Sequence, residues 1–122
     1  MFHIVAALTI GLCASPASAS SFTVRDMLPW CEGYLVDGPK DVMAAYCLGA
    51  VTGIHAVMQI NCEISRNLPA PRPPLPAADG AGIAEARLQA FVNWARNNPT
   101  EWETDFRVGV MKATSETWPC QI

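Results

Sequence analysis

Apolar residues recur along this chain at spacings of three and four, which is the pattern of helices with one buried face. No segment alternates apolar and polar residues at every second position, as a half-buried strand does. Past residue 24, the longest stretch without a charge runs from Val42 to Cys62. We therefore predict an all-α fold, a small four-helix bundle organised around a central helix over this stretch.

The predicted central helix has two different faces. One face is narrow and formed by small and aliphatic residues, namely Val42, Ala45, Gly49, Gly53, Ala56 and Ile60. The opposite face carries Cys47, Val51, Ile54, Met58 and Cys62. Glycines four residues apart remove Cβ atoms where another helix could approach closely. We expect both faces to be covered, with close helix packing at Gly49 and Gly53 either within the monomer or across a dimer.

A membrane span is the alternative for an uncharged stretch of this length. Polar residues interrupt it at Thr52, His55, Gln59 and Asn61, and no basic cluster flanks it. These features favour a core helix, so we expect no membrane span in the mature chain.

A shorter helix should precede the central one. Thr23 and Asp26 have the spacing of a capping box, and apolar residues follow with helical spacing. Pro29 lies inside this pattern, so we expect a short or kinked helix that ends at Gly33.

Two more helices are expected near the carboxy terminus. The third should cover Ile83 to about Asn97, because its apolar residues share one face. The segment Thr100-Glu-Trp-Glu103 has the pattern of a second capping box and should open the fourth helix, which Pro119 ends.

Residues 63–80 hold half of all the prolines, which argues against regular helix or paired strand there. We expect a long proline-rich loop between the second and third helices. A loop of this length in a small domain is either a functional projection or a floppy insertion, and the sequence leaves both open.

The first 19 residues resemble a secretory signal peptide. An apolar run from Ile4 to Leu12 is followed by small residues and an Ala17-Ser-Ala19 cleavage pattern. We predict removal of residues 1–19, with Cys13 among them, and a mature single domain over 20–122 in the periplasm.

Four cysteines remain in the predicted mature chain: Cys31, Cys47, Cys62 and Cys120. An even number in a small exported chain indicates two disulfides. Cys47 and Cys62 cannot pair, because ~22 Å of one helix separates them. Two consecutive helices joined by a short turn run antiparallel, which favours Cys31 with Cys47 and leaves Cys62 with Cys120.

Charge and residue chemistry argue against several function classes. The formal net charge is −3 and the pI about 5.2, unlike a nucleic-acid-binding domain. No C-x-x-C pair is present and the mature chain has one histidine, His55, so we expect no metal and no cofactor. His55 lies mid-helix without a free thiol beside it, so we predict that the protein is not an enzyme.

The overall pattern resembles the Tai-like family of type VI secretion amidase immunity proteins. The residues that carry the resemblance are Trp30-Cys31, Cys47-Leu-Gly-Ala-Val-Thr-Gly53, Cys62, Asn98-Pro99 and Trp118-Pro-Cys120. The resemblance covers nearly the whole mature chain. The segment after Cys62 is longer and richer in proline than the connection typical of the family, and helix four opens differently.

The resemblance implies an exported, helical, disulfide-bonded protein that is commonly a homodimer. It also implies binding to an incoming peptidoglycan amidase, whose active-site cleft a projecting loop blocks. From loop length we expect the contact surface in residues 63–80 and on the exposed face of the third helix. The candidate contact residues in the loop are Asn67, Leu68, Arg72, Leu75 and Asp79.

Two other functions fit the same sequence. The size and the helical, disulfide-bonded build are similar to those of periplasmic acid-stress chaperones, which hold unfolded clients on apolar surface exposed at low pH. A helical envelope protein without a single partner is the third possibility.

Overall fold

The computed structural model describes residues 21–80 and 82–122, so the predicted signal peptide at residues 1–19 lies outside the described residues. Four α-helices follow one another: α1 (Val24–Asp37), α2 (Val42–Asn67), α3 (Ala84–Asn97) and α4 (Phe106–Thr117), with a short 3₁₀ turn η1 (Pro99–Glu101) before α4. No β-strand occurs within the described ranges. Disulfides join Cys31 to Cys47 and Cys62 to Cys120. The predicted all-α fold and disulfide pairing are confirmed.

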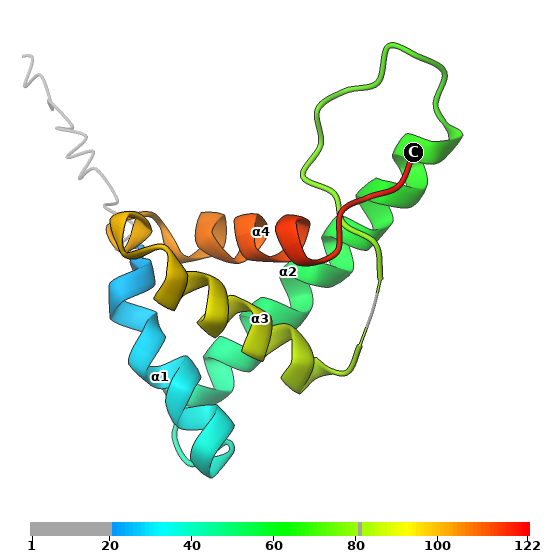
Figure 1. Cartoon of the computed structure of the whole chain (residues 1–122). Helices are drawn as coiled ribbons and strands as arrows, with labels where there is room; N and C mark the ends of the chain where they lie inside the picture. The colour runs from blue at the N-terminus through cyan, green and yellow to red at the C-terminus, as the bar shows by residue number, and fades with distance from the viewer. Residues whose placement is uncertain (1–20, 81) are drawn as a thin grey trace, which may run out of the picture.

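α2 is the axis of the molecule. Its amino-terminal half packs against α1, α3 and α4, whereas its carboxy-terminal half extends beyond them beside a loop and the chain end (Figure 1). The main core lies where the four helices meet, and its largest fully buried side chains are Met27, Leu88, Phe91 and Phe106. The two ends of α2 therefore have different surroundings.

α1 begins as the sequence predicts, because Thr23 and Asp26 each accept the other's backbone N–H at 3.1 and 2.9 Å. The predicted end at Gly33 is wrong, since α1 continues to Asp37. Pro29 removes one hydrogen bond near the start of the helix and the remaining turns hold. Gly38, at φ 73°, ends α1 in a conformation that a residue without Cβ adopts easily.

The prediction that Thr100 opens the fourth helix is also wrong. α4 begins at Phe106, with Asp105 as its N-cap. The carbonyls of Trp102 and Thr104 accept the backbone N–H groups of Arg25 and Val24, each at 2.9 Å. These carbonyls cap the start of α1, so they are not available for helical hydrogen bonds to the residues that follow.

One face of α2 is buried and the opposite face is exposed. Cys47, Val51, Met58 and Cys62 are buried, and Ile54 is partly buried. The face that carries Gly49 and Gly53 is exposed, and a Cβ added at either glycine would meet nothing within 4 Å. Close helix packing at these glycines within the monomer is therefore wrong. Packing across a dimer stays a prediction.

The proline-rich loop starts later than the sequence indicated. Residues 63–67 continue α2 as regular helix, and the helix ends only at Leu68, whose backbone is extended. The physical reason is the position of the first proline, Pro69, which disfavours the helical conformation in the residue before it. The loop itself contains one cis peptide bond, between Ala70 and Pro71.

Candidate functional site

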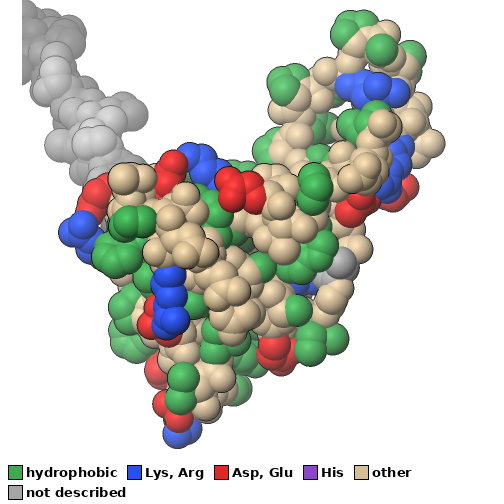
Figure 2. All heavy atoms as spheres, in the orientation of Figure 1, with side chains coloured by type: hydrophobic (Ala, Val, Ile, Leu, Met, Phe, Trp, Pro, Cys, Tyr) green, Lys and Arg blue, Asp and Glu red, His purple; other side chains and the backbone are tan. Residues whose placement is uncertain are grey.

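The candidate site is the loop that follows α2, which we call the anchored loop and define as residues 68–80. It leaves the end of α2, stands away from the bundle and returns past the chain end (Figure 1). Residues 66–76 are all exposed. Figure 2 shows hydrophobic side chains and blue basic groups on this projection, well separated from the bundle surface. The loop is therefore a projection that another molecule can reach.

Hydrogen bonds hold the outgoing limb of the loop against α2. Arg72 donates from Nε to the carbonyl oxygens of Ser65 at 2.7 Å and Leu68 at 3.1 Å. These are carbonyls at the end of α2, where the helix lacks partners of its own. Asn61 donates from Nδ2 to the carbonyl of Pro76 at 2.8 Å. The loop thus folds back along the last turns of α2.

The returning limb is fixed between α2 and the carboxy-terminal segment. Ala78 is fully buried, and its N–H donates to the carbonyl of Met58 at 3.2 Å. The next N–H, of Asp79, donates to the carbonyl of Trp118 at 2.9 Å. Ala78 also forms an antiparallel bridge with Pro119. The base of the loop is consequently part of the folded structure, unlike that of a floppy insertion.

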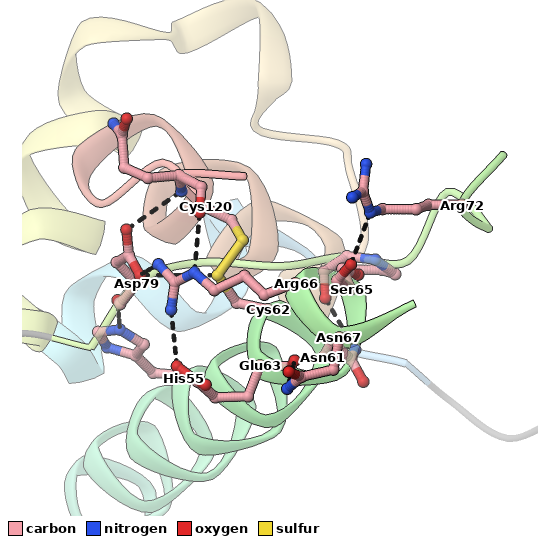
Figure 3. Close-up of a disulfide and its surroundings, with 12 residues drawn as sticks. His55, Asn61, Cys62, Glu63, Ser65, Arg66, Asn67, Arg72, Asp79 and Cys120 are labelled. Carbon is pink, nitrogen blue, oxygen red and sulfur yellow. Dashed lines mark hydrogen bonds and ion pairs between the residues drawn. A yellow bond between two sulfur atoms is a disulfide. The ribbon is translucent and has the colours of Figure 1, made fainter. Parts of the chain in front are cut away.

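At this base the side chains of His55, Arg66, Asp79 and Trp118 meet the backbone of Gln121, and we call these five residues the anchor cluster. Figure 3 shows His55, Arg66 and Asp79 beside the Cys62–Cys120 disulfide. The carboxylate of Asp79 forms an ion pair with Arg66 and accepts the N–H of Gln121 at 3.2 Å. Arg66 also donates to the carbonyl of Gln121 at 2.8 Å and pairs with Glu63 at 2.6 Å. One arginine therefore joins α2, the loop and the chain end.

The charges in the cluster support one another. The hydrogen bond from the Arg66 side chain, with that from the Gln121 backbone, holds the pKa of Asp79 below its ordinary value. The same contact with Asp79 raises the pKa of Arg66. Both groups therefore stay charged over the whole neutral range, and the anchor persists there.

His55 lies at the bottom of the cluster and is fully buried. Its Nε2 lies 2.9 Å from the carbonyl oxygen of Asp79, and its ring stacks on Trp118 with centroids 4.9 Å apart. Burial has the largest effect on the pKa of His55 and lowers it. The hydrogen bond to Asp79 acts in the opposite direction, and the nearby charge of Arg87 adds a smaller lowering effect. His55 thus links the loop base and the end of α4 to the middle of α2.

The predicted contact residues fall into two groups. Leu68, Arg72 and Leu75 lie on the exposed part of the loop, and Asn67 is the exposed last residue of α2. Asp79 lies at the base, where its carboxylate is engaged by Arg66 and Gln121. The structure therefore gives Asp79 a positioning role, which differs from the surface role the sequence suggested for it.

Sequence reasoning missed most of the anchor cluster. A long stretch of chain separates Arg66 from Trp118 and Gln121, and no spacing rule joins them. The pairing of Cys62 with Cys120 was the available signal. That bridge brings the chain end to α2, so residues on either side of each cysteine had to meet.

No group of three histidine, cysteine or acidic side chains that could hold a metal ion occurs in residues 21–80 and 82–122. α2 is long and apolar enough to cross a membrane by length and composition alone. A core helix of a soluble protein passes the same test, and one face of α2 is packed against the bundle.

An apolar groove of about 250 Å³ lies beside the loop, between α2 and α4, and Val57, Met58, Pro76 and Met111 are among the residues that line it. It adjoins the exposed face of α2. The surface around the anchored loop is therefore largely uncharged on this side.

Comparisons with protein-family models, with curated proteins and with solved structures found no match to this chain.

Proposed function

We propose that this protein is a periplasmic immunity-type protein that binds a peptidoglycan amidase delivered by type VI secretion and blocks its active-site cleft with the anchored loop. The carrying observation is a projection whose base is fixed by a disulfide, an ion pair and backbone hydrogen bonds while its outer residues stay exposed. Two disulfides are typical of a small exported protein, which supports the location.

The chemistry of the loop suits entry into a cleft. Its exposed segment 68–76 is rich in proline, carries the apolar side chains Leu68 and Leu75, and has a single charged residue, Arg72. Proline restricts the backbone before binding, so little conformational entropy is lost when the loop becomes ordered against a partner. Because Arg72 bonds to α2 through Nε, its terminal nitrogens are the part of the guanidinium that can reach an acidic group on the partner.

The exposed face of α3 is the second part of the proposed contact surface. Gln89, Asn93 and Asn97 follow one another at spacings of four along it, and all three are exposed. Uncharged amides of this kind provide hydrogen bonds at the rim of an interface.

Inhibition of an amidase tests the proposal directly. Residues 20–122, with both disulfides formed, would be mixed with the protein encoded by the neighbouring gene, and peptidoglycan cleavage followed as the molar ratio is raised. We expect inhibition that is complete near stoichiometric amounts, together with a stable complex. A catalytically active amidase that forms no complex would overturn the proposal.

The loop is tested by replacing Pro71–Pro76 with a Gly/Ser segment of equal length. We expect this variant to need an at least tenfold higher concentration for the same inhibition, with the fold retained. The matched control replaces an exposed apolar residue elsewhere, Val36→Ser on α1, which is 81% exposed. Equal inhibition by the loop variant and the control would show that the loop is not the inhibitory element.

We further propose that the protein is a homodimer that uses the exposed face of α2. Val42, Val57 and Ile60 on this face are 82%, 56% and 59% exposed, an unusual density of apolar surface on one helix. Gly49 and Gly53 lie between them with open space above. A second copy crossing there would bury the apolar residues and approach closely at the glycines.

The same exposed face favours the alternative function of a holdase chaperone, because unfolded clients bind to apolar surface. Mixing with an aggregating client at low pH separates the two functions. A chaperone suppresses aggregation of several unrelated clients, whereas an immunity-type protein acts on its amidase alone.

A further inference from the structure

His55 has an environment that suits only its neutral form. Because the carbonyl of Asp79 is an acceptor, Nε2 carries the proton and donates to it. Nδ1 is then an acceptor, and it is buried without a hydrogen-bond partner. A second proton on the ring would place an N–H at Nδ1 with no acceptor and a charge away from water, and both are unfavourable.

The charged groups around the ring do not offset this cost. On α3, the positive charge of Arg87 acts against a second positive charge on His55. In the loop, the carboxylate of Asp79 is engaged by Arg66 and by the N–H of Gln121, while only its backbone carbonyl meets His55. From the end of α4, the ring is covered by the uncharged indole of Trp118.

The packing around His55 is separate from the main core. The main core is formed by residues of α1, the first half of α2, α3 and α4, and it includes neither His55 nor Met58, Cys62 or Ala78. His55, Met58 and Cys62 belong to the second half of α2, and the buried Ala78 of the loop lies against it. The region can therefore open to water while the main core stays folded.

The covering segments are themselves tethered. The Cys62–Cys120 disulfide lies two residues beyond Trp118, and it keeps the chain end beside α2 even when the indole leaves the ring. Ala78 and Asp79 are held at the same place by one backbone hydrogen bond each, to Met58 and to Trp118, and the Asp79 carboxylate keeps its contacts with Arg66 and the N–H of Gln121 as a further tether. An opening here is short in range and reversible.

We propose that His55 is an acid-sensitive latch: its protonation releases the loop base at Ala78–Asp79 and the Trp118 indole, exposing the second half of α2 while the main core remains folded. The latch would set the position of the anchored loop by pH. This inference does not depend on which partner the loop binds.

Amide hydrogen exchange and histidine NMR on residues 20–122, with disulfides intact, test the latch between pH 7 and 4.5. The range ends above the ordinary pKa of carboxylates. His55 is the one histidine of residues 20–122, so its ring signals need no further assignment. We expect the ring to titrate below about 6.5, and protection factors of Ala78 and Asp79 to fall by up to ~tenfold per pH unit below that value.

The protection factors of main-core residues such as Phe91 and Val92 should stay constant over the same range. Titration of His55 at or above about 6.5, or a fall in protection spread evenly over both regions, would overturn the latch. The matched variant is His55→Gln, whose amide nitrogen can donate to Asp79 without titrating. In this variant the protection factors of Ala78 and Asp79 should no longer vary with pH. If they fell with pH as they do in the wild type, the proposal would be refuted. If the variant does not fold, the wild-type titration decides alone.

Discussion

Gly109 of α4 lies so close to Val24 of α1 that a Cβ atom built at position 109 would stand 2.6 Å from Val24 Cγ2. The same Cβ would be 3.2 Å from the Trp94 ring and 3.6 Å from the Phe91 ring. This glycine, and not those of α2, is the position where two helices of the bundle require the absence of a side chain.

Gly109→Ala is accordingly expected to destabilise the fold by about 1–3 kcal/mol, because the added methyl group overpacks a filled core. Gly49→Ala is the matched control on an exposed helical position with open space above it. It should stabilise the monomer by about 0.5–1 kcal/mol, since alanine is the better helix former. Urea unfolding measures both free energies. A Gly109→Ala protein as stable as the wild type would contradict the packing described for α1 and α4.

The two disulfides should contribute unequally. The Cys62–Cys120 bridge closes a chain separation of 58 residues and the Cys31–Cys47 bridge one of 16. On the loop-entropy model these correspond to roughly 4 and 3 kcal/mol. Guanidinium unfolding of the two double Cys→Ala variants should therefore show the larger loss for Cys62/Cys120.

The two bridges also differ in what they hold. Loss of Cys62–Cys120 should lower amide protection at the base of the anchored loop, whereas loss of Cys31–Cys47 should lower it between α1 and α2. Identical protection maps for the two variants would show that the bridges do not act on separate regions.

Asp105 gives a prediction for acid pH. It caps α4, accepting the N–H of Arg107 at 2.9 Å, and its carboxylate also meets the Arg107 guanidinium at 3.0 and 3.1 Å. The side-chain hydrogen bond from Arg107 is the main cause that lowers the pKa of Asp105 to about 2 from 3.8. Because the folded-state pKa is depressed, this stabilisation is present above about pH 3.8 and is lost as the pH falls toward 2.

Asp105→Asn should therefore remove part of the acid dependence of stability. At pH 7 it should cost up to about 1 kcal/mol, because asparagine keeps the N-cap hydrogen bond and only the charge interaction with the exposed Arg107 is lost. Below pH 4 its free energy of unfolding should approach that of the wild type. Glu103→Gln serves as the control, because the Glu103–Arg25 ion pair is mostly exposed and should contribute less than about 1 kcal/mol. Parallel pH curves for Asp105→Asn and the wild type would contradict this role.

The sequence was informative where local chemistry decides the structure. The Thr23–Asp26 capping box, the period of the apolar residues in α3 and the Cys31–Cys47 pairing follow from rules of helix spacing and reach. The start of α4 was not predictable in the same way, because Trp102 and Thr104 give their carbonyls to α1, far away in the sequence.

The candidate site was likewise predictable only where local sequence decides its structure. The prolines predicted where the loop lies, but its anchoring depends on contacts between residues far apart in the sequence, such as Arg66 with Asp79 and His55 with Trp118. The second of these involves the chain end that the Cys62–Cys120 bridge holds beside α2. The apolar face at Gly49 and Gly53 was expected to be covered, because hydropathy alone does not distinguish a buried face from one left open on the monomer.

That open face gives the last prediction. If a second copy covers it, Gly53→Leu places a large side chain at the crossing point and should shift the protein from dimer to monomer in sedimentation equilibrium, with the helical content kept. Val36→Leu on α1 alters a residue that is 81% exposed outside the face, so it should leave the dimer intact. Gly49→Ala then distinguishes helix propensity from packing between the two copies. The alanine should stabilise each monomer, because it is the better helix former, and weaken the dimer, because its methyl group lies where the two α2 helices would cross. A wild-type protein that remains monomeric at high concentration would show that a second copy does not cover this face, and the client-aggregation assay would then test whether unfolded clients bind to it.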